Sequence, residues 1–230
     1  MCKISSYVVA ATVLLALALC PVTARADSTS FDLTVAPTSP ALAVLPGPYI
    51  SVAVDLTSST TADITFMSYT QGAFTYLMGD GKSVGLNVNA SMFSASIITD
   101  AGFFGNGALI GGIPAGQGAA QFDSLPGTFN FWISNNEDNG GYNGLVNKIE
   151  FTITASGVNW LHASDVLAPN SGGLDAASHI TVDDGSCRPT QSCVTGYGTT
   201  QPVPEPPVNA LLACSALLFG GFFLRRPLWS

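Results

Sequence analysis

Apolar and polar residues alternate with a period of two over several short segments of the chain. The alternation is clearest at 50–56, 129–133 and 149–153, where every second residue is Ile, Val, Leu or Phe. A period of two places successive side chains on opposite faces of a strand, so each segment is predicted to form a half-buried antiparallel β-strand. Weaker strand candidates of the same kind lie at 31–35, 62–67, 74–78, 83–88, 92–98 and 179–182.

Helical periodicity is scarce, and one short turn is expected at 163–167, with Ser164 as its cap. Many short strands separated by Gly, Asn and Pro predict an all-β fold, an antiparallel β-sandwich or jelly roll, over residues 27–182. A Gly- and Ala-rich segment at 102–121 is typical of a long surface loop. Residues 183–202 are polar and contain Pro, so they are predicted to form a linker.

Residues 1–26 have the three parts of a secretory signal peptide. Lys3 supplies positive charge, residues 7–20 are apolar, and Ala24 and Ala26 frame a cleavage site. The apolar run spans about 21 Å as a helix, too short for a hydrocarbon core of roughly 30 Å, which argues against an N-terminal membrane anchor. We therefore expect cleavage after Ala26. Lipidation at Cys20 is a weaker alternative, because Leu19 stands where a lipoprotein signal has a small residue.

Residues 203–230 contain a second apolar segment, with a different ending. Its parts are Val203, Pro204, Glu205 and Pro206, then the apolar run 208–224, then Arg225 and Arg226. As a helix the run spans about 26 Å, close to the short limit for crossing a bilayer. A buried core helix is the alternative, but such a helix is usually apolar on one face only. Because positive charge prefers the cytoplasmic side, the arginine pair is predicted to be a cytoplasmic anchor of a single transmembrane helix.

This order of motif, apolar helix and arginine cluster resembles the PEP-CTERM sorting signal of Gram-negative bacteria. The resemblance covers the last 28 residues or so, and it departs from the family pattern at Pro207 and in the four residues after Arg226. It implies recognition by an exosortase, a membrane protease that acts near the motif and releases the protein to the cell surface or the extracellular matrix. Residues 129–180 resemble, more loosely, the exported β-rich domains that accompany this signal, which implies no activity.

Charge excludes one class of partner. Only 10% of the 230 residues are charged, and the formal net charge is −8. Lys82, Lys148 and Arg188 are the only basic side chains between Asp27 and Thr200. Binding to nucleic acid requires clustered Lys and Arg, so no nucleic-acid partner is expected.

Catalytic patterns are weak in this sequence. Ser83 lies in Gly81-Lys82-Ser83-Val84-Gly85, which matches the nucleophile-elbow pattern, but that motif requires a following helix and residues 86–90 alternate like a strand. Residues 79–81 are instead predicted to form a hairpin turn. Neither His162 nor His179 has a thiol or carboxylate at metal-ligand spacing, and Glu150 lies on the solvent face of a predicted strand. We therefore predict no catalytic residue, no cofactor and no metal-ligand set among these side chains.

Two further features involve loops. Residues 135–141, Asn-Asn-Glu-Asp-Asn-Gly-Gly, are rich in oxygen ligands and are a candidate Ca²⁺ site, although a turn explains the same residues. Cys187 and Cys193 are the only cysteines between the two terminal segments, and in an oxidising compartment they are expected to form a disulfide. Their C-x5-C spacing differs from the C-x-x-C of redox catalysts.

The sequence thus predicts a non-enzymatic exported protein. We expect it to be anchored transiently in the inner membrane, processed by an exosortase-type protease and then retained at the surface or in a matrix of extracellular polysaccharide. The first alternative is a secreted carbohydrate- or ice-binding module that uses Trp132, Trp160 or Tyr142 as exposed stacking residues. An extracellular hydrolase that uses Ser83 is the other alternative.

Overall fold

The computed structural model describes residues 27–79, 81–102, 119–134, 145–186 and 193–200. These residues form an 11-stranded sheet in which every strand pairing is antiparallel. The prediction of an all-β antiparallel fold is therefore confirmed. Within these residue ranges, two short helical segments accompany the sheet, the helix α2 (Pro40–Ala43) and the 3-10 turn η2 (Ala163–Asp165). η2 confirms the turn expected at 163–167, but its N-cap is His162, and Ser164, the expected cap, lies inside the turn. The helix α2 was not predicted.

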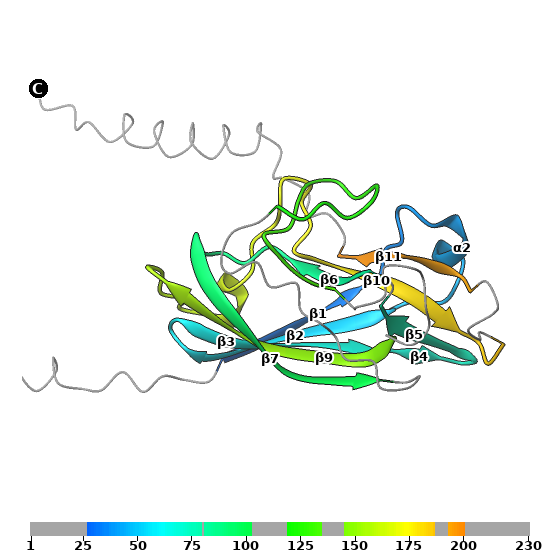
Figure 1. The fold of residues 1–230 in the computed structure, drawn as a ribbon, viewed down its shortest axis with the longest axis horizontal. Helices are drawn as coiled ribbons and strands as arrows, with labels where there is room; N and C mark the ends of the chain where they lie inside the picture. Colours follow the sequence, from blue (N-terminus) through cyan, green and yellow to red (C-terminus); the bar gives the residue numbers. More distant parts are fainter. Residues whose placement is uncertain (1–26, 80, 103–118, 135–144, 187–192, 201–230) are drawn as a thin grey trace, which may run out of the picture.

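The sheet has two halves (Figure 1). The first half-sheet consists of β1 (Asp27–Leu33), β2 (Ile50–Ser58), β3 (Thr61–Ser68), β9 (Val146–Ser156) and β7 (Met92–Gly102). The second half-sheet consists of β4 (Thr70–Gln71), β5 (Phe74–Met78), β10 (Ala176–Asp183), β6 (Lys82–Leu86), β8 (Phe131–Ser134) and β11 (Thr195–Thr199). Among the described strands, the two halves are connected by one strand pairing, that of Met78 in β5 with Val146 in β9.

The first half-sheet follows the alternation in its sequence. In β2, Ile50, Val52, Val54 and Leu56 are buried, while the residues between them are half-buried or exposed. β3 and β9 carry the same pattern in register, so Val54 lies beside Ile64 and Ile64 lies beside Phe151. Apolar side chains of neighbouring strands therefore share one face, and polar side chains share the other.

The second half-sheet contains an arrangement that differs from the predicted hairpin. β5 and β6 do not pair with each other. Both pair with β10, Met78 lying beside Ile180 and Val84 beside Ser178, so they run end to end along one edge of that strand. Gly79 and Gly81, which lie between the two strands, have positive φ angles, a conformation that glycine adopts readily.

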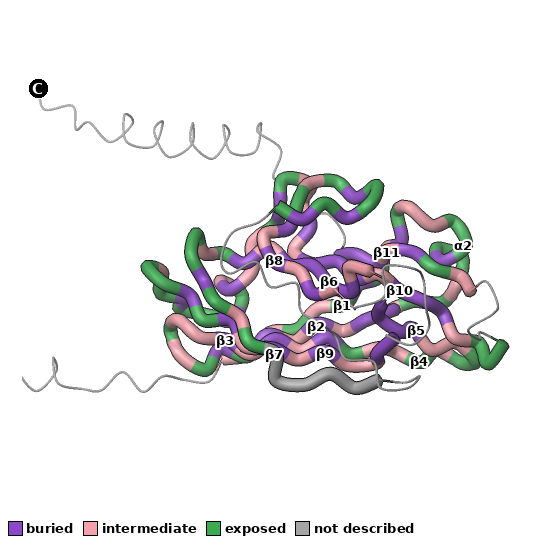
Figure 2. Tube along the Cα trace, viewed as in Figure 1, coloured by how far each residue is buried: buried purple, intermediate pink, exposed green. Residues whose placement is uncertain are grey.

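One core joins the two half-sheets. A single buried cluster contains Val54, Ile64 and Phe151 of the first half-sheet together with Leu86 and Ile180 of the second. A separate outer cluster lies on the other face of the second half-sheet and consists of Ala120, Phe122, Leu125, Phe129, Leu174 and Ala177. Figure 2 shows the result as nearly continuous burial along β5, β6 and β10.

The boundary of the β-rich domain differs from the prediction. Residues 183–202 were expected to form a linker, but Thr195–Thr199 form β11, which pairs with β10 from Thr181 to Ala177. Val35 also pairs with Thr199 across to the N-terminal part of the chain. The strand was missed because its Thr, Gly and Tyr residues carry no apolar alternation. It is nevertheless largely buried in the structure, where it pairs with β10.

Several predicted elements lie outside the described residues. These are the signal peptide at 1–26 with its cleavage residues Ala24 and Ala26, the sorting segment 203–230 and most of the loop at 102–121. Within the parts of the chain that the structure covers, no helix has the length and apolar character needed to cross a membrane.

Candidate functional site

Ser83 does not occupy a nucleophile elbow. It lies within β6, fully buried, and the chain after it continues as a strand through Leu86. Its hydroxyl has no hydrogen-bond partner among the described residues, and its backbone carbonyl accepts a hydrogen bond from the Ser178 hydroxyl at 2.9 Å. A nucleophile must be accessible to substrate and lie beside a base, so this serine has a packing environment rather than a catalytic one.

The two histidines lie on different elements, His162 next to η2 and His179 in β10. His162 precedes η2 and is largely exposed, with Nδ1 3.4 Å from the Asp27 carboxylate. His179 lies in β10 and stacks on Tyr197 of β11, with ring centroids 4.6 Å apart. Among the described residues, no group of three His, Cys, Asp or Glu side chains is placed to hold a metal ion. The proposed calcium loop at 135–141 lies outside the described residues.

The remaining candidates have structural partners. Glu150 forms an ion pair with Lys148 at 2.6 Å on the outer face of β9. Trp160 was expected to be an exposed stacking residue, but only 3% of it is exposed and its indole N–H donates to the carbonyl of Asn89. Trp132 is half-buried against the outer cluster. Burial removes Trp160 from the residues that can stack on a ligand, while Tyr142 lies outside the described residues.

Only one of the two cysteines in the expected disulfide is among the described residues. Cys193, which begins the segment leading into β11, is disulfide-bonded. Cys187 lies outside the described residues, so the pairing of Cys187 with Cys193 stays a prediction. Leu77 and Leu145 form a small buried cluster against which Cys193 packs. The cysteine therefore lies beside the start of β9, where the two half-sheets meet.

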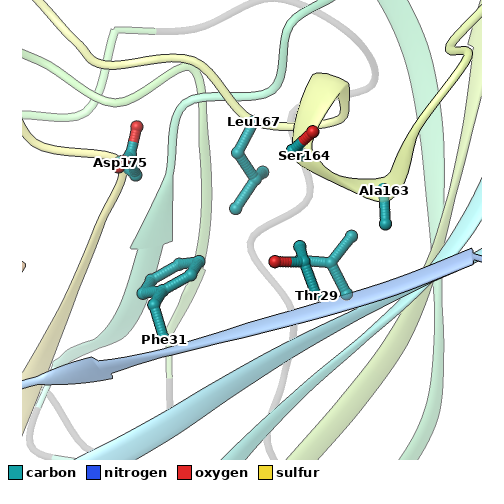
Figure 3. Close-up of a pocket in the computed structure, with 7 residues that line it drawn as sticks. Thr29, Phe31, Ala163, Ser164, Leu167 and Asp175 are labelled. Carbon is teal, nitrogen blue, oxygen red and sulfur yellow. The ribbon is translucent and has the colours of Figure 1, made fainter.

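A pocket that sequence reasoning missed opens at the free edge of β1. Thr29, Phe31, Val54, Ala163, Ser164, Leu167 and Asp175 line it, and its volume is about 160 Å³. In Figure 3, Phe31 and Thr29 rise from β1 toward Leu167, while Asp175 lies at one end and Ser164 at the other. Alternation in β1 signals that Thr29 and Phe31 face inward, but nothing in the sequence indicates that η2 and Asp175 lie opposite them.

Asp175 is the acidic group of this pocket. It directly precedes β10, is partly buried, and has no hydrogen-bond or ion-pair partner for its carboxylate among the described residues. Burial raises the pKa of this carboxyl above its ordinary value. Its backbone is fixed by two hydrogen bonds, N–H to the Thr200 hydroxyl and carbonyl to the N–H of Asn87. The pocket thus combines mostly apolar walls with one acid whose backbone is held in place.

Comparison with known proteins adds no relative. No family model matches the chain, and no curated protein and no solved structure shows a significant match to it.

Proposed function

We propose that this protein is a non-enzymatic, exported surface or extracellular-matrix protein that is sorted through its C-terminal segment. The observation that carries the proposal is the order of three features at the end of the chain: Val203–Pro206, the apolar run 208–224, and Arg225 with Arg226. An exosortase-type membrane protease is the proposed processing partner. Extracellular polysaccharide is the proposed environment of the released protein.

The fold is compatible with processing at both ends. β1 begins at Asp27, directly after the proposed signal cleavage site, so removal of residues 1–26 leaves every described strand complete. At the other end, β11 stops at Thr199, four residues before Val203. A protease that cuts near the motif therefore does not need to unfold the sheet. We include in the proposal that the two half-sheets, which share one core, form a β-sandwich.

The side chains that a hydrolase would use support a non-enzymatic role. Ser83 is buried within a strand, and Glu150 is ion-paired on the solvent face of β9. Burial of Trp160 also weakens the alternative of a carbohydrate-binding module based on exposed tryptophans. Retention in a matrix then depends on the sorting route and on the acidic character of the chain, whose formal net charge is −8.

The experiment expresses the full chain in cells with and without an exosortase. We expect a smaller, released form only where the protease is present, and N-terminal sequencing of that form should begin at Asp27. The double variant Pro204→Ala/Glu205→Ala should remain membrane-bound and unprocessed. Pro207→Ala, directly outside the motif, is the matched control and should be processed normally. Equal processing of both variants, or equal release without the protease, would refute the proposal.

A further inference from the structure

The pocket beside β1 is a second candidate site, independent of the sorting segment. Its residues come from five separate parts of the chain: β1, β2, η2, Leu167 and Asp175. Backbone hydrogen bonds hold this surrounding structure. The carbonyl of Val166 accepts from Asn89, the N–H of Ala168 donates to Asn87, and the carbonyl of Asp175 accepts from Asn87. The walls are therefore preformed around strand β6 and the turn that follows it, as small-molecule pockets usually are.

The walls are mostly apolar. Thr29 and Phe31 face inward from β1, Val54 forms the floor from β2, and Ala163 and Leu167 close the opposite side. Figure 3 places the Phe31 ring and the Leu167 side chain on opposite sides of the same space. A cavity of roughly 150 Å³ is large enough for benzene, so about 160 Å³ fits a body the size of one six-membered ring.

The acid at one end sets the charge of the ligand. The Asp175 carboxylate has no partner among the described residues, although its neighbourhood excludes part of the surrounding water. A carboxylate in an apolar environment is stabilised most by a cation, which supplies both charge and hydrogen-bond donors. An anionic ligand would be repelled, and a purely apolar ligand would remove further water from the carboxylate without replacing it.

We propose that this pocket binds a small protonated amine whose ammonium group pairs with the Asp175 carboxylate and whose ring-sized apolar body lies between Phe31 and Leu167. Thr29 and Ser164 are the two hydroxyl-bearing residues that line the same pocket. Protonated amino sugars and protonated hydrocarbon amines both contain this ammonium group. What the two ligand classes share is a cationic nitrogen attached to a ring-sized group.

Binding to the full chain is measured by saturation-transfer NMR with cyclohexylamine, and cyclohexanol serves as the neutral probe of the same shape. A hydrogen bond to a charged group contributes enough for about a tenfold difference in affinity. We therefore expect cyclohexylamine to bind about tenfold more tightly than cyclohexanol. Displacement of cyclohexylamine by D-glucosamine would place the natural ligand among amino sugars. Failure of D-glucosamine to compete would place it among hydrocarbon amines, and either result upholds the pocket assignment.

Two substitutions separate charge from shape. Asp175→Asn should lower the affinity for cyclohexylamine to that for cyclohexanol and leave cyclohexanol binding unchanged. Asp123→Asn removes one charge at an exposed position outside the pocket and should change neither. Thr29→Phe should fill the pocket and abolish binding of both probes. The assignment is wrong if the two probes bind equally, if neither binds at millimolar concentration, or if Asp123→Asn weakens amine binding as much as Asp175→Asn.

A measurement on the unmodified chain covers the case in which a variant does not fold. Bound cyclohexylamine should lower the pKa of the Asp175 carboxyl, because a neighbouring cation favours the ionised form. The carboxyl carbon resonance reports this titration directly, and cyclohexanol should produce no such decrease. An unchanged Asp175 titration at saturating amine would overturn the proposal.

Discussion

The two half-sheets use the same antiparallel hydrogen bonding but bury different fractions of their side chains. In the first half-sheet, β2 and β3 alternate between buried and more exposed positions, as expected for a sheet with one face on the core and one in solvent. In the second half-sheet, β6 and β10 are buried at nearly every position. The difference teaches that alternation is the clearer signal of a strand when one of its faces is left to solvent.

The outer cluster accounts for this difference. Phe122 and Phe129 pack edge to face, with ring centroids 5.2 Å apart, over the face of the second half-sheet that lies away from the shared core. Gly85 of β6 lies directly beneath them, and a Cβ added there would lie 2.5 Å from the Phe122 ring. The segment that carries these phenylalanines therefore acts as a second cover for β6 and β10, and the described part of the chain contains no counterpart on the first half-sheet.

The largest effect is expected from removing that cover. Phe122→Ala should lower the free energy of unfolding by about 3–5 kcal/mol, because a fully buried aromatic side chain is lost and a cavity remains. Thr65→Ala, on the solvent-facing side of β3, should change it by less than about 0.5 kcal/mol. Urea denaturation followed by tryptophan fluorescence measures both. Similar losses in the two variants would contradict the distinction between the half-sheets.

A smaller effect is expected where the cover approaches the sheet most closely. Gly85→Ala should cost about 1–3 kcal/mol, because the added methyl group overlaps the rings of Phe122 and Phe129. In a Phe122→Leu background, the same substitution should cost less, since a smaller side chain then lies opposite the methyl group. A double-mutant cycle by urea denaturation measures this coupling. Additive losses would mean that the strand itself, rather than the ring above it, excludes a side chain at this position.

Strands were predicted most clearly from the sequence where one face of the strand is exposed to solvent. The segments 50–56 and 149–153 were identified from alternation and form β2 and β9. Among the weaker candidates, 74–78 forms β5, and 83–88 overlaps β6. The strands that β5 and β6 pair with could not be derived, because a hairpin at 79–81 is locally as reasonable as the end-to-end arrangement that the structure contains. That choice is made by pairing with β10, about a hundred residues later in the chain.

The pocket could not be predicted from the sequence for a related reason. Phe31 and Asp175 are far apart in the chain and have no shared motif. They meet because β1 is an edge strand of the sheet and Asp175 directly precedes β10 at the opposite side of the core. The proposed sorting segment is the reverse case, since its three parts are consecutive and all of the information on which that proposal rests is local.

Two serines provide a third, milder comparison within the second half-sheet. The Ser178 hydroxyl donates to the carbonyl of Ser83, so Ser178→Ala should cost about 1 kcal/mol. The Ser83 hydroxyl is buried without a partner, so Ser83→Ala should be neutral or slightly stabilising. Thermal unfolding of the two variants distinguishes them. A large loss for Ser83→Ala, or loss of an esterase activity present in the unmodified chain, would contradict the packing role of Ser83.

The smallest effect concerns Asp175, where a charged group lies against the same covered half-sheet. Because burial raises its pKa in the folded state, the folded protein binds a proton more readily than the unfolded chain does. Its stabilising contribution is therefore present at a pH below the unfolded value of 3.8 and is lost as pH rises through the folded pKa. Asp175→Asn should then be more stable than the unmodified chain at neutral pH.

The dependence on pH distinguishes this cause from a general effect of charge. The advantage of Asp175→Asn should shrink as the pH falls and vanish where the carboxyl is protonated in both states. Asp123→Asn, which removes a carboxylate from an exposed position, is the matched control for the reduction in net charge. Urea denaturation of both variants at neutral and acidic pH makes the comparison. Burial affects Asp175 but not the exposed Asp123, whereas repulsion between like charges is relieved in both variants. If both variants gained the same free energy of unfolding at neutral pH, relief of overall repulsion would therefore be the cause, rather than burial of Asp175.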